Sequence, residues 1–295
     1  MQNPIHRVSQ IYHEALTSLH TWRNWFPLLI FWAVQGLLLW TLTAIIARPA
    51  GAWLRNLLHA EFGAESTEYP RFYLVLPDLH RRLNLVLALS LGALVQGVSL
   101  LQLINWHTGG KLQREAPWRR ACARWPGLVL INLVLLAGFL VPLSVAERLL
   151  PLFGNTVPDR MILLAACAPG LLGAIALLYA PLLYVGFSSS WWTAIRGSFR
   201  FARRHAGVSL ILVLVPCLLA LPIYGLTLLS RPIVMDFRPE LMLHVLNFSS
   251  FLALLVLFVE LSTLVRYYAE EALRRPYQGE WDDKPETARV YTDSG

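Results

Sequence analysis

The chain has 295 residues, of which 56% are hydrophobic and only 15% are charged. Ordinary soluble domains have roughly 45–50% apolar and about 25% charged residues, so this composition excludes a typical soluble fold. The formal net charge is +7, but the basic residues are divided among several short connections, which argues against a nucleic-acid-binding surface.

Six apolar runs are long enough to cross a bilayer as helices, which takes about 20 residues for roughly 30 Å of hydrocarbon. We therefore expect an all-α, polytopic membrane protein in which residues 1–275 form one transmembrane domain, followed by a flexible cytoplasmic tail at 276–295. A polar lead precedes the first run, so no cleavable signal sequence is expected. The runs cover residues 25–47, 85–106, 127–145, 161–187, 208–229 and 243–265.

The segment before the first run has apolar residues at alternating three- and four-residue steps, which predicts an amphipathic helix. Trp22 and Trp25 lie at its end, where we expect them to anchor the chain at the membrane interface. His6, His13 and His20 form a separate stripe. A metal site or a pH sensor is one interpretation of this stripe, and plain polar residues at the headgroup level is the other.

Residues 48–84 separate the first two runs and form the longest expected extramembrane loop. Its part 53–62 has helical spacing and predicts a short helix on the outer membrane surface. Two prolines in 69–78 predict an extended turn. We expect a helix from about Pro77 to continue into the second span.

Two further basic segments precede the third and fifth spans, and each predicts an interfacial helix. In 111–125, Trp118 and Trp125 are expected to anchor the helix, while Arg119 and Arg120 contact lipid phosphates. In 188–204 the apolar residues Trp192, Ile195, Phe199 and Ala202 oppose a basic face. Trp191 and Trp192 are the expected anchors there, and the expected headgroup contacts are Arg196, Arg200, Arg203 and Arg204.

The same order of a basic, aromatic segment followed by two apolar runs occurs three times. This order predicts three tandem hairpins derived from one repeated unit. Sixteen of the 25 basic residues lie in the N-terminal segment, the second and fourth connections and the C-terminal segment. By the positive-inside rule, both termini are expected in the cytoplasm.

Glu260 is the only acid well inside an expected span. It is either a functional carboxylate, with Gln35, Gln96, Gln102, Asn132 and Asn247 lining a path, or a structural ion-pair partner. At about 8 Å from the cytoplasmic end of its span, it can reach Arg266 or an arginine of the 191–204 segment. Prolines in the third to fifth spans favour a cavity but are also common in ordinary transmembrane helices.

Small residues at four-residue spacing allow two helices to approach closely. They occur at Ala93 and Gly97 in the second span and at Ala166, Gly170 and Ala174 in the fourth. We expect these two spans to pack against each other.

The sequence has no phosphate-binding loop, no HExxH, no GxSxG and no CxxC pair. It therefore gives no catalytic residue, no metal site and no cofactor, and we expect a protein that is not an enzyme.

The segment 188–204, SSSWWTAIRGSFRFARR, leads into a proline-containing span. It resembles the six-span YciC-like inner-membrane proteins of bacteria and the membrane domain attached to some glycerophosphoryl diester phosphodiesterases. The resemblance implies a bacterial inner-membrane protein with cytoplasmic termini and a role in envelope or lipid biology. The phosphodiesterase activity belongs to a separate soluble barrel, so the resemblance transfers no catalytic residue.

These observations favour an accessory or scaffold protein of the cell envelope that binds anionic phospholipid at the cytoplasmic leaflet. A membrane-protein partner or a second copy of the chain is compatible with this role. The alternative is a small permease or a transporter of lipid or solute, with a polar path near Glu260.

Overall fold

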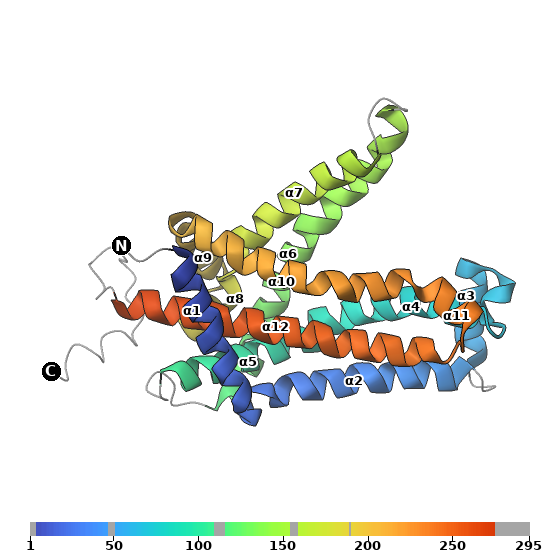
Figure 1. Cartoon of the computed structure of the whole chain (residues 1–295), viewed down its shortest axis with the longest axis horizontal. Coiled ribbons are helices and arrows are strands. Elements are labelled where there is room, and N and C mark those ends of the chain that lie inside the picture. The colour runs from blue at the N-terminus through green and yellow to red at the C-terminus, as the bar shows by residue number, and fades with distance from the viewer. Residues whose placement is uncertain (1–3, 47–50, 109–115, 154–158, 189, 275–295) are drawn as a thin grey trace.

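The computed structural model describes residues 4–46, 51–108, 116–153, 159–188 and 190–274, and every regular element in these ranges is helical. Figure 1 shows the arrangement. Short single turns and one π-helical turn join the longer helices. In chain order the helices are α1 (Pro4–Thr17), α2 (Trp22–Ile46), α3 (Ala52–Phe62), α4 (Phe72–Leu87), α5 (Ala93–His107), α6 (Pro117–Phe153), α7 (Asp159–Leu177), α8 (Ala180–Gly186), α9 (Trp191–Arg204), α10 (Ala206–Leu228), α11 (Ser230–Asp236) and α12 (Leu241–Arg274).

Six helical stretches are long and apolar enough to cross a membrane, which confirms the predicted number. This set of helices is that of a multi-pass membrane protein. The stretches are Trp22–Ala44, Phe72–His107, Pro117–Pro142, Ala168–Gly186, Ala206–Ile223 and Leu241–Glu271.

The second stretch differs most from its predicted limits, since it begins at Phe72 rather than at Leu85. Helix α4 continues through a π-helical turn, Ala88–Gly92, into α5. The predicted helix from about Pro77 into the second span is therefore confirmed, but the predicted extended turn at 69–78 is wrong from Phe72 onward, because Pro77 lies inside α4. The charged residues Asp78, Arg81 and Arg82 interrupt the apolar run without ending the helix, which is why hydropathy misses this part.

The predicted interfacial helix at 111–125 is not a separate element in the described residues. Helix α6 begins at Pro117 and continues without a break into the third span. Residues 111–115 lie outside the described part of the chain. The tail 276–295 and residues 48–50 of the predicted loop lie outside it as well.

The fourth predicted span is divided into two helices, because α7 ends at Leu177 and α8 begins at Ala180. Pro181 lies in the first turn of α8, a position that needs no helical N–H. A proline there starts a helix well and continues one poorly, which explains the division.

Helix α12 occupies the centre of the bundle and packs against α1, α2, α5, α10 and α11. Figure 1 shows α2, α4–α5, α10 and α12 side by side, with α1 lying across one end and α3 and α11 at the other. The α6–α7 hairpin leaves the bundle at an angle. Helix α1 begins and α12 ends at the same end as α9. The repeat of three hairpin units remains a prediction.

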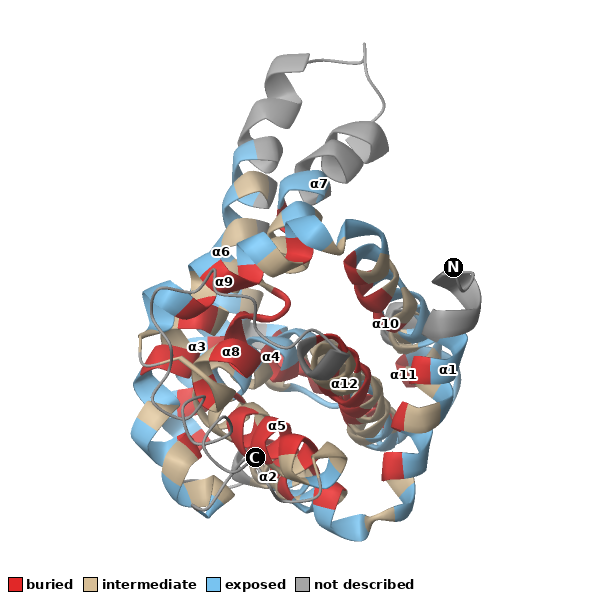
Figure 2. Cartoon of the chain, turned by 90° about the vertical axis from the view of Figure 1, so that its left-hand side faces the viewer, coloured by how far each residue is buried: buried red, intermediate tan, exposed pale blue. Residues whose placement is uncertain are grey.

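The main core connects helices from both halves of the sequence. It includes the buried side chains of Leu28, Leu103, Tyr179, Phe258 and Tyr267. Viewed along the bundle in Figure 2, buried residues line the facing sides of α5, α8, α9 and α12, while the outer faces are exposed. The core therefore holds α9 against the end of the bundle.

Candidate lipid-facing site

Helix α9 is attached to the bundle by a face of small residues. Ala194, Gly197, Ser198 and Ala202 are buried, and such residues let helix backbones approach closely. The Ser198 hydroxyl donates to the carbonyl of Ala176 at 2.7 Å and accepts the N–H of Tyr179 at 3.2 Å. It thereby satisfies backbone groups that the division between α7 and α8 leaves without helical partners.

The end of α9 is tied to α12 by polar contacts. His205 follows α9, and its Nδ1 shares a hydrogen bond of 2.8 Å with the hydroxyl of Tyr267. Its Nε2 lies 3.9 Å from a carboxylate oxygen of Glu271. Because α9 is held at its middle through Ser198 and at its C-terminal end through His205, the direction of its outer face is fixed by the fold.

The outer face of α9 carries the predicted arginines. Arg196, Arg200, Arg203 and Arg204 are all exposed, and α9 contains no acidic residue. Among the described residues, Arg196, Arg200 and Arg203 have no carboxylate partner. The guanidinium of Arg196 lies over the ring of Trp192, 5.0 Å from its centroid, which leaves its N–H groups available.

Exposed aromatic residues accompany these arginines. Trp191, Trp192 and Phe199 are 37%, 48% and 55% exposed. The predicted apolar stripe of α9 is divided, because Ala202 faces the bundle while Trp192 and Phe199 face outward. Large apolar side chains that neighbour unpaired cations are typical of a helix at a membrane interface.

The arginines of α6 divide into exposed and bonded ones. Arg119 is exposed, as a headgroup contact requires. Arg120 donates to the carbonyl of Gly186 at 2.7 Å, so it is engaged at the end of α8. Arg124, which sequence reasoning missed, donates to the carbonyls of Tyr184 and Ser188, the latter at 2.6 Å. Arginine is a known partner for the last carbonyls of a helix, but no pattern in the sequence indicates that a helix ends at Gly186.

The predicted anchor tryptophans lie in different surroundings. Trp22 is 66% exposed, whereas Trp25 stacks on Phe258 with ring centroids 4.7 Å apart. Trp118 packs against a cluster of buried side chains between α5 and α6 that includes Leu101 and Leu128. Trp125 donates from Nε1 to the carbonyl of Ser90, in the π-helical turn, at 2.8 Å. Trp25 and Trp125 therefore also connect helices within the protein.

Four polar residues of the spans form two local pairs, whereas the side-chain oxygens of Gln102 and Asn247 have no hydrogen-bond partner among the described residues. Gln35 donates to Asn84, and Asn132 donates to Gln96 at 3.0 Å. Each pair joins two neighbouring helices, α2 with α4 and α6 with α5. This arrangement is typical of interhelical hydrogen bonds.

Glu260 differs from the predicted ion-pair arrangement. Arg266 pairs with Glu14 of α1 instead. In the described part of the chain, Glu260 has neither a hydrogen-bond partner for its carboxylate nor an ion-pair partner. Of the two interpretations of Glu260, the structural ion pair with Arg266 or with an arginine of the 191–204 segment is therefore not formed among the described residues.

The small residues Ala93 and Gly97 are buried, and the predicted packing of the second span against the fourth is made by α5 and α8. The nearest side chains to Gly97 are those of Leu128 and Ala121 of α6 and Val185 of α8. Gly170 of α7 is also buried, while Ala174 is half-buried. The side chain of Ala166 lies outside the described part. The close approach at Gly97 is therefore made with α6 and α8.

No group of three or more His, Cys, Asp or Glu residues suited to a metal ion occurs among the residues described. Comparison of the whole chain with family models, with curated proteins and with solved structures finds no match in any of the three.

Proposed function

We propose that this protein is a non-enzymatic component of the bacterial inner membrane that binds anionic phospholipid at the cytoplasmic leaflet through α9. The observation that carries the proposal is the outer face of α9, on which Arg196, Arg200 and Arg203 are exposed without carboxylate partners. Each arginine near an anionic leaflet contributes about 1 kcal/mol to binding. Arg119 of α6 is exposed, and its neighbour Arg120 reaches the end of α8, so Arg119 is a candidate for a further phosphate contact.

The same arginines support a cytoplasmic placement of this end. Cytoplasmic connections of membrane proteins carry an excess of basic residues, and α9, the start of α1 and the end of α12 lie at one end of the bundle. Cys122 is exposed near the start of α6. In a variant with Cys167 and Cys217 replaced by serine, an impermeant thiol reagent should label Cys122 in inside-out vesicles and leave it unlabelled in right-side-out ones.

The lipid proposal is tested with the triple variant R196Q/R200Q/R203Q in nanodiscs of mixed phosphatidylglycerol and phosphatidylcholine. Native mass spectrometry of the released protein measures the ratio of the two lipids that stay bound. We expect the preference for phosphatidylglycerol to fall at least tenfold, because three cations without carboxylate partners are removed.

The matched control is R71Q/R81Q/R82Q, which removes the same number of positive charges from the other end of the molecule. These three arginines are paired with acids, so the preference should change little. An equal loss in both variants would contradict a site on α9. An accessory role with a membrane-protein partner, or with a second copy of the chain, belongs to the same proposal, and the same spectra report such a partner by its mass.

A further inference from the structure

A second polar site lies where α12 meets α1 and α10, and it is separate from the outer face of α9. It comprises Tyr12 of α1, Cys217 of α10, and Glu260 and Thr263 of α12, and we name it the Glu260 junction. Both α1 and α10 pack against α12. The Ser262 hydroxyl of α12 donates to the carbonyl of Ala15 at 3.3 Å, one helical turn from Tyr12 on α1. The charge of the Glu260 carboxylate acts on both Tyr12 and Cys217, so the three side chains belong to one neighbourhood.

Tyr12 brings a hydroxyl without an acceptor to this junction. Its oxygen is shielded from solvent and has no hydrogen-bond partner among the described residues. The neighbouring Thr263 hydroxyl is directed to helix carbonyls, those of Val259 at 2.8 Å and Glu260 at 2.9 Å. Burial and the nearby carboxylate raise the pKa of Tyr12 to about 12. The hydroxyl therefore keeps its proton at neutral pH and is available as a donor.

Glu260 brings a carboxylate without a cation. The nearest arginine along α12, Arg266, pairs with Glu14, which lies on a different side of α1 from Tyr12. A carboxylate at membrane depth is costly unless it meets a cation, a donor or a proton. The Tyr12 hydroxyl therefore lacks a hydrogen-bond acceptor, and the Glu260 carboxylate lacks a positively charged donor.

The junction is open on its outer side. Glu260 is partly exposed, and on α10 the side chains of Leu214, Cys217 and Leu218 are exposed. In a multi-pass membrane protein such a surface faces lipid. Helix α1 lies across this end of the bundle (Figure 1), so the junction is next to the level of the headgroups. A ligand therefore reaches it from the lipid side.

We propose that the Glu260 junction binds a zwitterionic headgroup with a primary ammonium, of the phosphoethanolamine type. The ammonium would donate to the Glu260 carboxylate, and a phosphate oxygen would accept from Tyr12, so that one ligand satisfies both groups. A choline headgroup has no N–H to donate, and a glycerol headgroup has no cation. A single carboxylate is also too few ligands for a divalent metal ion. This site goes beyond the anionic-lipid site on α9 and does not depend on it.

The test uses nanodiscs that contain phosphatidylethanolamine and phosphatidylcholine in equal amounts, with native mass spectrometry of the lipids retained. Wild type should retain phosphatidylethanolamine about tenfold more than phosphatidylcholine, and Glu260→Gln should remove this preference. Tyr12→Phe, which removes only the hydroxyl, should reduce it about threefold. Equal retention of the two lipids by wild type, or an unchanged preference in both variants, would overturn the proposal.

The matched control is Glu14→Gln, which removes a carboxylate from α1 without touching the junction and should keep the preference. Soluble phosphoethanolamine distinguishes a free ligand from a lipid. If it competes with the lipid in wild type, the headgroup alone is recognised; if it does not, the acyl chains are needed as well, and both results fit the inference. The variant R196Q/R200Q/R203Q should keep the preference for phosphatidylethanolamine, so that failure of the α9 site and failure of this one are distinguishable.

Discussion

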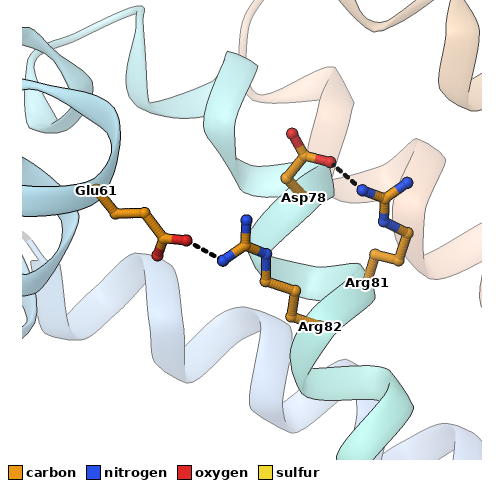
Figure 3. A network of polar contacts seen from close by, with 4 residues as sticks. All are labelled: Glu61, Asp78, Arg81 and Arg82. Carbon is orange, nitrogen blue, oxygen red and sulfur yellow. Dashed lines mark hydrogen bonds and ion pairs between the residues drawn. The ribbon is translucent and has the colours of Figure 1, made fainter. Parts of the chain in front are cut away.

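The two ends of the molecule use arginine in opposite ways. At the α3–α4 end, Arg82 pairs with Glu61 and Arg81 with Asp78, as Figure 3 shows, and Arg71 pairs with Glu65. At the α9 end, the exposed arginines have no acid on their own helix. Both ends are basic in sequence, so the number of arginines alone does not identify a binding surface. The acids that accompany the arginines make the difference, because a paired cation is already neutralised.

The largest effect is expected from a half-buried arginine at the α9 end, Arg124. Arg124→Met removes a charged donor from the last carbonyls of α8 and should lower the free energy of unfolding by about 3 kcal/mol. Thermal unfolding in detergent measures the loss. Arg119→Met, at a neighbouring exposed position, should stay within about 0.5 kcal/mol of wild type. Equal stability of the two variants would show that the α8 carbonyls do not need Arg124.

The attachment of α9 gives the next effect. Ser198→Ala leaves the N–H of Tyr179 and the carbonyl of Ala176 without their partner, which should cost about 1–2 kcal/mol. Ser190, at the start of α9, makes no capping bond with its side chain. Ser190→Ala is therefore the control and should be neutral in the same unfolding assay. A comparable loss at Ser190 would mean that the bridge at Ser198 is not specific.

A third variant gives α9 the acid that it lacks. Thr193 lies in the first turn of α9, three residues before Arg196, so Thr193→Glu places a carboxylate beside that arginine. We expect the preference for phosphatidylglycerol to fall about threefold, with no loss of stability because an acid suits the start of a helix. Thr193→Gln should keep the preference. If the glutamate variant also keeps it, Arg196 does not contact the lipid.

The smallest effect is expected at the paired end. A double-mutant cycle with Arg82→Gln and Glu61→Gln should give a coupling of about 0.5–1 kcal/mol, because both side chains are about half exposed. The coupling should decrease with added salt. A coupling of several kcal/mol, insensitive to salt, would mean that this pair is effectively buried and would weaken the contrast between the two ends.

The sequence predicted the helical class and the six spans, since both follow from the amount and spacing of apolar residues. The spacing of apolar residues also predicted which face of α9 carries the exposed arginines. Because α9 has no acid within its length, the sequence also showed that these arginines lack a partner on their own helix. It could not predict that Arg266 pairs with Glu14 and not with Glu260, or that Arg124 donates to a carbonyl of α8. Those choices depend on which helices become neighbours, and hydropathy does not encode this. The first turn of α4 was missed because Pro70 and Pro77 favoured an extended turn, although a helix tolerates Pro77 inside α4.

The hydroxyl of Ser198 joins α9, at one end of the bundle, to the backbone of the fourth span. Because this hydroxyl bonds both the carbonyl of Ala176 and the N–H of Tyr179, α9 is not an independent helix on the membrane surface. A force that lifts α9 toward the aqueous phase must expose two backbone groups inside the fourth span, where no water replaces the lost partner. A force applied to the arginines of α9 is therefore transmitted to the break between α7 and α8, so that a displacement of α9 requires a displacement of α7 and α8.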